Sequence, residues 1–581
     1  MLVVFEGIDG SGKTTLSNRV VARLRKRGLT VKHLRADGKF ASPVTEAIRS
    51  LGRDARNIDL DPKAEFLLYV TREVQNVEEV LKPALLEHDV VVADRFFPTA
   101  EVIGRYGRRL PEAWTQPILT TAASGIEPEL YVLVDVDPAL ARARRKAHKL
   151  TVSETKPPSR RGLAGVGLQH RLREGYLALA RERSERWVRV DNESAPLDET
   201  VVRVSDLIED VRNLGASKGI EGYRSRMQPL ANAGVAPARD REKLRTPADA
   251  LERFMQWVNQ RAVIEPLAAS YMLSGLSGAA VDSMRESLSE RVPDVALIGV
   301  SGLTDEVSWR IRERLAPAHA VAAARSLTGI SNLDERARNL RYALCDGARA
   351  PREVLQSLAR QDDDHAWALR SQWLGELPDA VMRSLRGLDT ARAWEQRERW
   401  LAAHSGRLGT DYDVACIAAA SVTGLNDDRA WAVRRAIWPV APVAALESIA
   451  GLGSERSWEQ RDKYLVRAPK IVMGTLRSMR DPRAWSMRQA VAADCKEAID
   501  SIPELDEPEA WALRDNYADI WPSTAVKTLG RLADSQRGQA YVERQLAAHA
   551  NNISLLKHTA AIALGVHWFT ARELEAQPEG L

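Results

Sequence analysis

The residues best suited to chemistry lie in one glycine-rich stretch near the amino terminus, Gly7-Ile8-Asp9-Gly10-Ser11-Gly12-Lys13-Thr14. This stretch fits the pattern G-x-x-x-x-G-K-[ST], in which glycines let backbone N–H groups close around phosphate oxygens. Lys13 is placed to reach the outer phosphates, and the Thr14 hydroxyl is placed to hold Mg²⁺. The pattern predicts a site for ATP or another nucleoside triphosphate, formed by Gly7, Asp9, Gly10, Ser11, Gly12, Lys13, Thr14 and Thr15.

The elements around this stretch are those that a phosphate loop requires. Residues 2–5 form an apolar run suited to a buried parallel strand, and residues 14–27 have the apolar spacing of an amphipathic helix. Further strand-like runs alternate with helical stretches, at 29–34, 90–93, 130–134 and 187–190. This alternation predicts an α/β fold with a parallel sheet and helices on both faces.

Polar residues follow two of these runs, where a parallel sheet binds its ligands. Asp94 and Arg95 follow the run at 90–93, and Arg35 follows the run at 29–34. A carboxylate beside a phosphate loop commonly helps to hold Mg²⁺, and an arginine next to it can bind a phosphoryl group with two hydrogen bonds. We therefore expect these side chains to complete the triphosphate site.

Several motifs, in the correct order, resemble those of the thymidylate kinase family. They are the loop with its acidic Asp9, the Asp-Arg-aromatic motif at 94–96, and the segments at 72–75, 77–84 and 170–177. The resemblance covers roughly residues 1–213, about a third of the chain. It implies a P-loop kinase that transfers the γ-phosphoryl group of ATP to dTMP, with Mg²⁺, in cytoplasmic nucleotide biosynthesis. It also implies a homodimer formed through this domain.

The family's functional residues carry over by position. Lys13, Asp94, Arg95 and, at the position of the lid arginine, Arg160 would be catalytic, and Thr14 and Asp94 would hold Mg²⁺. The acceptor nucleotide would be bound by Asp9, Arg35, Leu68, Arg72 and Arg95.

The departures from the family pattern fall on the acceptor side and on the lid. Leu68 stands where the family has a phenylalanine that stacks on thymine, and Tyr69 is the nearest ring. Val102-Ile103-Gly104 replaces Ala-Tyr-Gln, and Ala36-Asp37-Gly38 replaces Glu-Pro-Gly. In the lid, Ser159 and Gly162 replace two acids. These changes predict weakened selectivity for thymidine nucleotides.

The rest of the chain has a different character. Residues 215–245 contain several glycines and prolines with mixed charges, which predicts a linker between a kinase domain at 1–214 and a helical domain at 246–581. Thr246-Pro247-Ala248-Asp249 is a typical helix start.

A tryptophan followed three residues later by an arginine recurs at intervals of about 26 to 30 residues, with one longer step of about 37. The tryptophans are Trp309, Trp367, Trp394, Trp431, Trp458, Trp485 and Trp511, and Arg338 and Tyr541 occupy the slot in two weaker copies. A fixed period of this size predicts a HEAT-like solenoid of paired helices, each of about ten residues. Such an array is expected to bind a protein partner.

The repeated tryptophans are expected to be core residues that lock one repeat to the next. The alternative is a ligand cage or a platform on which nucleic-acid bases stack. The arginines that follow them are expected on a solvated face or in pairs with nearby acids; binding of phosphates is the alternative.

Composition narrows the function classes. A formal net charge of +4 over 581 residues does not indicate a nucleic-acid-binding protein. The sequence has no uninterrupted apolar run of about 18 residues, so we expect no membrane span. Three widely separated cysteines, Cys345, Cys416 and Cys495, are expected to be free thiols in the cytoplasm.

Three functions fit these observations. The first is a nucleoside monophosphate kinase of thymidylate-kinase type with an appended protein-binding array. The second is a nucleotide-responsive scaffold whose kinase domain has degenerated. The third is a P-loop kinase that acts on a different small acceptor.

Overall fold

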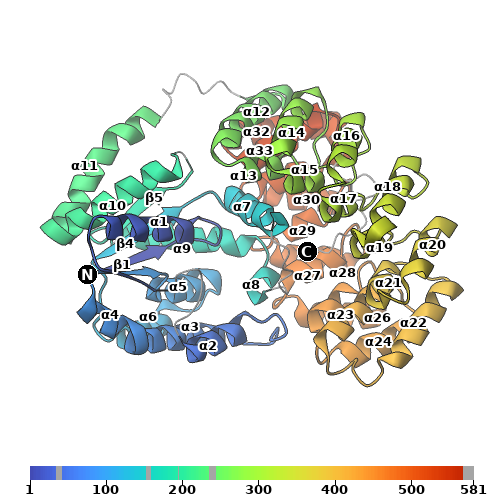
Figure 1. Cartoon of the computed structure of the whole chain (residues 1–581), viewed down its shortest axis with the longest axis horizontal. Helices are drawn as coiled ribbons and strands as arrows, with labels where there is room; N and C mark the ends of the chain where they lie inside the picture. The colour runs from blue at the N-terminus through green and yellow to red at the C-terminus, as the bar shows by residue number, and fades with distance from the viewer. Residues whose placement is uncertain (35–41, 152–158, 194, 235–243, 567–581) are drawn as a thin grey trace. The chain divides into compact units, whose positions relative to one another are not determined.

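A computed structural model describes residues 1–34, 42–151, 159–193, 195–234 and 244–566 of the chain. The chain divides into two compact units, one built mainly from residues 1–242 and the other mainly from residues 243–581. Figure 1 labels strands β1, β4 and β5 and most helices of both units. Among the described residues, no helix is both long and apolar enough to cross a membrane.

A parallel sheet of five strands forms the centre of the described part of the first unit, in the order β2-β3-β1-β4-β5. The strands are β1 (Leu2–Glu6), β2 (Val31–Leu34), β3 (Val90–Asp94), β4 (Leu130–Asp135) and β5 (Trp187–Asp191). β1 pairs with β3 on one side and with β4 on the other, and all of its residues are buried. The predicted α/β fold with a parallel sheet is confirmed.

Helices flank this sheet and supply the rest of its core (Figure 1). Val3 and Phe5 of β1 pack in one apolar cluster with residues of α1 and α10, such as Leu16 and Leu207. The helices of this unit are α1 (Lys13–Lys26), α2 (Pro43–Arg53), α3 (Pro62–Asn76), α4 (Lys82–Glu87), α5 (Phe97–Val102), α6 (Glu112–Ala123), α7 (Pro138–Thr151), α8 (Arg160–Leu163), α9 (Gly167–Glu182), α10 (Leu197–Leu214) and α11 (Ala216–Gly234). Two π-helical turns, Val77–Leu81 and Ile103–Gly107, continue α3 and α5.

Most of the predicted linker is helical. Residues 216–234 form α11, which packs against α10, so the prediction of a linker is wrong for this stretch; residues 235–243 lie outside the described part. Ile220 and Tyr223 are buried in the core cluster of the sheet. A Cβ at Gly219 would lie 2.6 Å from the backbone nitrogen of Val211. This glycine therefore allows close helix packing and does not mark a flexible segment.

The second unit is an array of helix pairs. The first helices of the pairs are α12 (Pro247–Ile264), α14 (Ala279–Arg291), α16 (Glu306–Leu315), α18 (Glu335–Cys345), α20 (Asp364–Trp373), α22 (Ala391–Ala403), α24 (Asp428–Ile437), α26 (Glu455–Tyr464), α28 (Pro482–Val491), α30 (Pro508–Asn516) and α32 (Gln536–His549). The second helices are α13 (Pro266–Met272), α15 (Pro293–Gly299), α17 (Ala320–Ser326), α19 (Pro351–Ser357), α21 (Pro378–Ser384), α23 (Tyr412–Ser421), α25 (Pro442–Glu447), α27 (Pro469–Thr475), α29 (Glu497–Asp500), α31 (Pro522–Lys527) and α33 (Ile553–Ala563).

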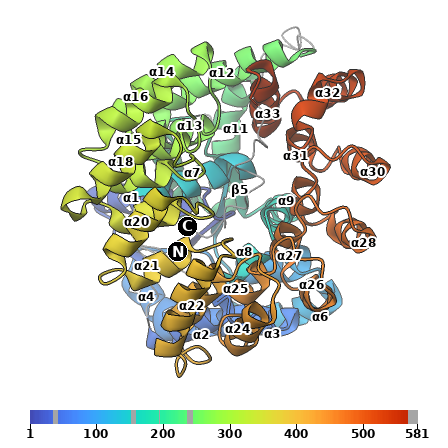
Figure 2. The same cartoon turned by 90° about the vertical axis from the view of Figure 1, so that its right-hand side faces the viewer.

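This array closes on itself. Each second helix packs against the second helix of the next pair, from α13 to α33. α33 then packs against α12, and Figure 2 shows these two helices side by side. The repeats therefore form a closed ring within the second unit, with no open end at α12. The repeat period predicts stacking of neighbours, but it carries no information about this closure.

The repeated tryptophans are buried, which confirms that they are core residues. Those in the clear copies are between 2% and 8% exposed. Several of them bond to a polar side chain five residues earlier; for example, the Trp394 indole N–H donates to Asp389 at 2.7 Å and that of Trp511 donates to Asp506 at 2.7 Å. Rings buried in this way cannot form a ligand cage or stack on nucleic-acid bases.

The repeated arginines are also buried, and here the expectation of a solvated face or acidic partners is wrong. Arg461 has no exposed surface; its guanidinium donates to the carbonyls of Leu452 and Ile449 at 2.7 and 3.0 Å and to the Thr475 hydroxyl at 2.9 Å. Arg312, Arg341, Arg370, Arg434, Arg488 and Arg514 make the same kinds of bond.

The physical reason is the supply of unpaired carbonyls at helix ends. Leu452 and Ile449 lie in the turn after α25, whereas Thr475 ends α27. Arg461 thus joins two successive second helices, and its five N–H groups satisfy carbonyls that water cannot reach. Burial lowers the pKa of Arg461 only to about 10, so the side chain is charged at neutral pH.

Replacing Arg461 with methionine should lower the free energy of unfolding of the array by roughly 3–5 kcal/mol, because several buried acceptors lose their donor. Urea denaturation followed by circular dichroism measures this loss. Arg456→Met is the matched control, since Arg456 is exposed and its pair with Asp428 lies on the surface. Equal losses in the two variants would contradict a structural role for the buried arginines.

Candidate active site

The glycine-rich loop joins β1 to α1 at the carboxyl edge of the sheet. Gly7, Gly10 and Gly12 have φ angles of 145°, 90° and 90°, in the region that favours glycine. A Cβ at Gly10 would meet the carbonyl of Ala141, and a Cβ at Gly12 would lie 2.5 Å from the Asn192 side chain. The Asn192 amide also donates to the Ser11 carbonyl at 2.7 Å. These glycines are therefore required for the loop to fit against its neighbours.

Lys13 begins α1 and is held inside the loop. Its side chain is buried, and its ammonium donates to the Ile8 carbonyl at 3.3 Å. Burial, together with the nearby Arg95 guanidinium, lowers the pKa of Lys13 to about 8, against the opposing effect of Asp94 and Asp9. A phosphate group in the loop would satisfy this cation better than the single carbonyl does.

Thr14 and Asp94 are brought together, as predicted for a magnesium site. Thr14 is the second residue of α1, Asp94 ends β3, and the Thr14 hydroxyl donates to the Asp94 carboxylate at 2.5 Å. Hydroxyl and carboxylate oxygens are the ligands that Mg²⁺ prefers. Two such oxygens beside a cradle for phosphates therefore fit this ion. Thr15, also predicted to bind ATP, lies on the exposed side of α1.

Arg95 is fixed by bonds on several sides. Its φ of 78° is unusual for a residue other than glycine, and its guanidinium donates to Asp9 at 2.5 Å and to the Tyr176 hydroxyl at 3.0 Å. Thr99 links this group to the buried Glu6, to which it donates at 2.8 Å. Burial alone would lower the pKa of Arg95, but Tyr176, Asp9 and Glu6 outweigh burial and raise it.

Asp9 is the shared partner of several cations. Besides Arg95, it lies 3.6 Å from the Arg161 guanidinium. Burial would raise the pKa of Asp9, but Arg95, Arg161, Lys13 and Arg53 hold it well below its ordinary range. The site therefore combines one firmly ionised carboxylate with more positive charge than that carboxylate can neutralise. Such a balance suits the binding of a polyanion.

Arg160, the predicted lid arginine, forms its ion pair with Glu65 and not with Asp9. Arg160 pairs with Glu65 of α3 at 2.6 Å, and Arg108 binds the same carboxylate at 2.7 Å. Its neighbour Arg161 is the residue that reaches Asp9. The sequence places both arginines in one short segment, but it does not show which of their side chains faces the loop.

The acceptor-side residues are only partly assembled as predicted. Arg72 is buried, and it donates to its neighbour Glu73 through Nε at 3.0 Å and through Nη2. Leu68 is half-buried, and a Cβ at Gly52 would lie 3.7 Å from its side chain. Tyr69 is the ring that lies among the arginines, with Arg161 4.8 Å from its centroid. Arg35 lies outside the described residues.

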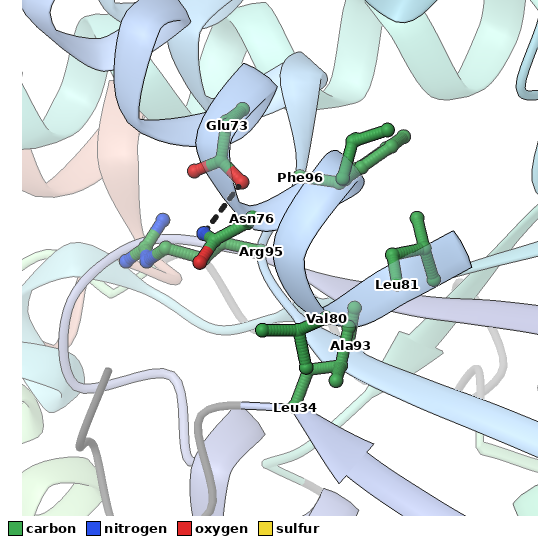
Figure 3. A pocket seen from close by; sticks show the side chains of 9 residues that line it. Leu34, Glu73, Asn76, Val80, Leu81, Ala93, Arg95 and Phe96 are labelled. Atoms are coloured by element: carbon green, nitrogen blue, oxygen red, sulfur yellow. Dashed lines mark hydrogen bonds between the residues drawn. The ribbon is translucent and has the colours of Figure 1, made fainter. Parts of the chain in front are cut away.

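A small cavity lies beside Arg95, below the end of α3 (Figure 3). Its volume is about 20 Å³, enough for a single water molecule. Asn76, which donates to Glu73 at 3.5 Å, gives it a polar side, and Leu34, Val80 and Leu81 give it an apolar side. The cavity is too small to hold a nucleotide.

A five-stranded parallel sheet with a glycine-rich phosphate loop, the bonded pair Thr14 and Asp94 and a cluster of arginines is the architecture of a P-loop kinase domain. The model of the thymidylate kinase family matches residues 5–203. The thymidylate kinase of Trichlorobacter lovleyi is 36% identical over 195 residues, which are 33% of this chain and 89% of that protein. The thymidylate kinase of Solidesulfovibrio magneticus is 33% identical over 196 residues, 34% of this chain and 93% of that protein.

Among solved structures, the thymidylate kinase of Ehrlichia chaffeensis aligns over 36% of this chain and 98% of its own length, with 20% identity and a TM-score of 0.28. The chain belongs to the thymidylate kinase family through its first unit. The matched relatives correspond to about a third of the chain, and the ring of helix pairs lies beyond the matched residues.

The lowered pKa of Lys13 predicts that ATP binding weakens as pH rises. In the free protein, Lys13 is charged below pH 8 and loses its proton above it. ATP affinity should then fall by up to roughly tenfold per pH unit above 8, because binding requires that the proton be regained. Titration calorimetry between pH 7 and 9.5 measures this slope.

Lys13→Arg is the control, since a guanidinium does not titrate in this range. The slope should be absent in this variant. The same slope in both proteins would show that another group is responsible.

Proposed function

We propose that the first unit is an ATP-dependent nucleoside monophosphate kinase, with Mg²⁺, that acts on dTMP or a related acceptor. The observation that carries this proposal is the group of cations around Asp9: Lys13, Arg95 and Arg161 converge on one carboxylate at the phosphate loop. Membership of the thymidylate kinase family supports the reaction class.

The residues divide the work of phosphoryl transfer. An oxygen of the acceptor's phosphate attacks the γ-phosphorus of ATP, and ADP leaves. Lys13 at the loop and Arg95 just after β3 stabilise the charge of the transferring group from two sides, in a largely buried site. Arg161 takes the part that the sequence assigned to Arg160, because it is the arginine of α8 that contacts Asp9. Thr14 and Asp94 would hold Mg²⁺, which neutralises charge on the phosphates when it is bound.

Selection among acceptors is proposed to be weak. Arg72 is occupied by Glu73, and Leu68 offers no aromatic ring. At Gly104 a Cβ would lie 2.7 Å from the ring of Phe66, so this ring fills space next to the position where the family has a glutamine. Three contacts to a thymine base are thus weakened together. We therefore propose dTMP as one acceptor among several.

The pairing of Arg72 with Glu73 also favours a second candidate, a nucleotide-responsive scaffold with slow turnover. In that case the first unit binds ATP, and the ring of helix pairs binds a protein partner. Both functions use the same loop, and they differ in whether ADP is released with a monophosphate present.

Lys13→Met should abolish phosphoryl transfer, because it removes the transition-state cation without changing side-chain volume greatly. The assay is ADP release with Mg²⁺-ATP and each of dTMP, dUMP, dCMP, dAMP and dGMP. The wild-type protein should turn over more than one of them with differences below about a hundredfold. A stronger preference for dTMP would contradict weak selection, and ATP binding without any turnover would favour the scaffold.

Arg161→Ala and Arg160→Ala form a matched pair that separates the two lid arginines. Arg161→Ala should lower kcat by roughly a hundredfold or more with little change in thermal stability. Arg160→Ala should mainly lower the melting temperature, because Glu65 would lose one of two buried partners. The reverse pattern would return the catalytic role to Arg160.

A further inference from the structure

The hydroxyl of Tyr69 stands out because it is buried and makes no hydrogen bond. Tyr69 lies on α3 and is 5% exposed, and its Oη has no partner among the described residues. Buried hydroxyl groups nearly always have a partner, because losing water without a replacement is unfavourable. An unsatisfied hydroxyl beside an anion site therefore suggests that a ligand supplies the missing bond.

The ring of Tyr69 is occupied by guanidinium groups. Arg161 lies over it at 4.8 Å from the ring centroid, and Arg72 lies over it at 5.1 Å. Arg72 is held in place by Glu73, and Arg161 by Asp9. A ring covered in this way is not available for stacking on a nucleobase. Tyr69 therefore does not replace the family's phenylalanine, although it is only one residue away.

The surroundings of the hydroxyl are those of a phosphate site. The Tyr69 phenol interacts electrostatically with both Arg161 and Arg53, and the Asp9 carboxylate also acts on both guanidiniums. Burial and the nearby Arg161 lower the pKa of Arg53 to about 10, against Asp9 and Tyr69. Arg53 ends α2, so three elements place two cations and one hydroxyl donor near the phosphate loop. Phosphate oxygens accept from such groups.

The geometry points to Tyr69 as a specificity-determining residue that donates its hydroxyl to the phosphate of the acceptor nucleotide, between Arg53 and Arg161. This inference rests on the proposed function and deepens it. The acceptor is bound through its phosphate, and Tyr69 makes no contact with the base. The substrate class is then the nucleoside 5′-monophosphates as a group, selected by the phosphate and not by thymine.

Tyr69→Phe tests this inference, because it removes one oxygen and keeps the ring. In the free protein the melting temperature should be unchanged or higher, since an unsatisfied hydroxyl is lost. KM for each monophosphate should rise about tenfold, by the same factor for every base, while KM for ATP should not change. Tyr223→Phe in α11 is the matched control, because Tyr223 is also 5% exposed but lies in the core of the sheet.

A purely structural role for the hydroxyl would lower the melting temperature and leave the acceptor KM unchanged, and that result would overturn the inference. An increase confined to dTMP would overturn it as well, because the hydroxyl would then read the base. Calorimetric titration of dTMP and of inorganic phosphate into the ATP-free protein gives a second measurement that needs no turnover. If the wild type binds these ligands but transfers no phosphoryl group, the proposed function fails, and weaker binding by Tyr69→Phe still supports the role of Tyr69.

Discussion

The carboxylate of Asp9 is the counter-ion on which the arrangement of the phosphate loop and its arginines depends. It bonds to Arg95 at 2.5 Å and lies 3.6 Å from Arg161, and its negative charge also acts on Lys13 and Arg53. Without it, four cations would repel one another in a site with little water. Asp9 cannot neutralise all of them, and Asp94 adds only one further carboxylate beside Lys13. The positive charge that remains allows the loop to attract phosphate groups. Asp9 thus holds the cations together without cancelling their attraction for a phosphate.

The two units solve the problem of buried positive charge in different ways. At the phosphate site of the first unit, arginines meet a carboxylate, as Arg95 and Arg161 meet Asp9. In the ring, the repeated arginines meet backbone carbonyls at helix ends. A backbone carbonyl stabilises a guanidinium without cancelling its charge. The buried carbonyl in turn needs the guanidinium as its hydrogen-bond donor. A carboxylate, by contrast, can release its arginine when a phosphate competes for it. Exchangeable pairs suit a site that binds ligands, whereas carbonyl bonds suit a scaffold.

In the ring of helix pairs, most of the repeated tryptophans lie between two guanidiniums. Trp394 has Arg397 of its own repeat at 4.9 Å from the ring centroid and Arg429 of the next repeat at 3.9 Å. Arg429 in turn pairs with Glu398 on the surface of the preceding repeat. One residue thus connects core and surface across the boundary between repeats. Because this contact recurs along the array, the stability of each repeat depends on its neighbour, and the contact between α12 and α33 gives the first helix a neighbour as well.

The sequence by itself determined the loop, the sheet and the repeat, because each depends on local patterns. Gly10, Gly12 and Lys13 fit a motif of fixed spacing, the strands are continuous apolar runs, and the tryptophan slots recur at a regular period. Thr14 and Asp94 could be paired because the carboxyl ends of parallel strands share one edge. These predictions needed no knowledge of contacts between distant residues.

Only the tertiary structure decided which charged side chains meet. Local pattern could not distinguish Arg160 from Arg161, because the difference is the direction of a side chain from a four-residue helix. It assigned the repeated arginines to a solvated face or to pairs with nearby acids, because charge alone does not reveal a row of unpaired carbonyls. It interpreted the glycines of α11 as a linker, because the sequence does not show that Gly219 allows close packing against α10. In each case the deciding contact joins residues of different elements, and such contacts leave no mark in local spacing.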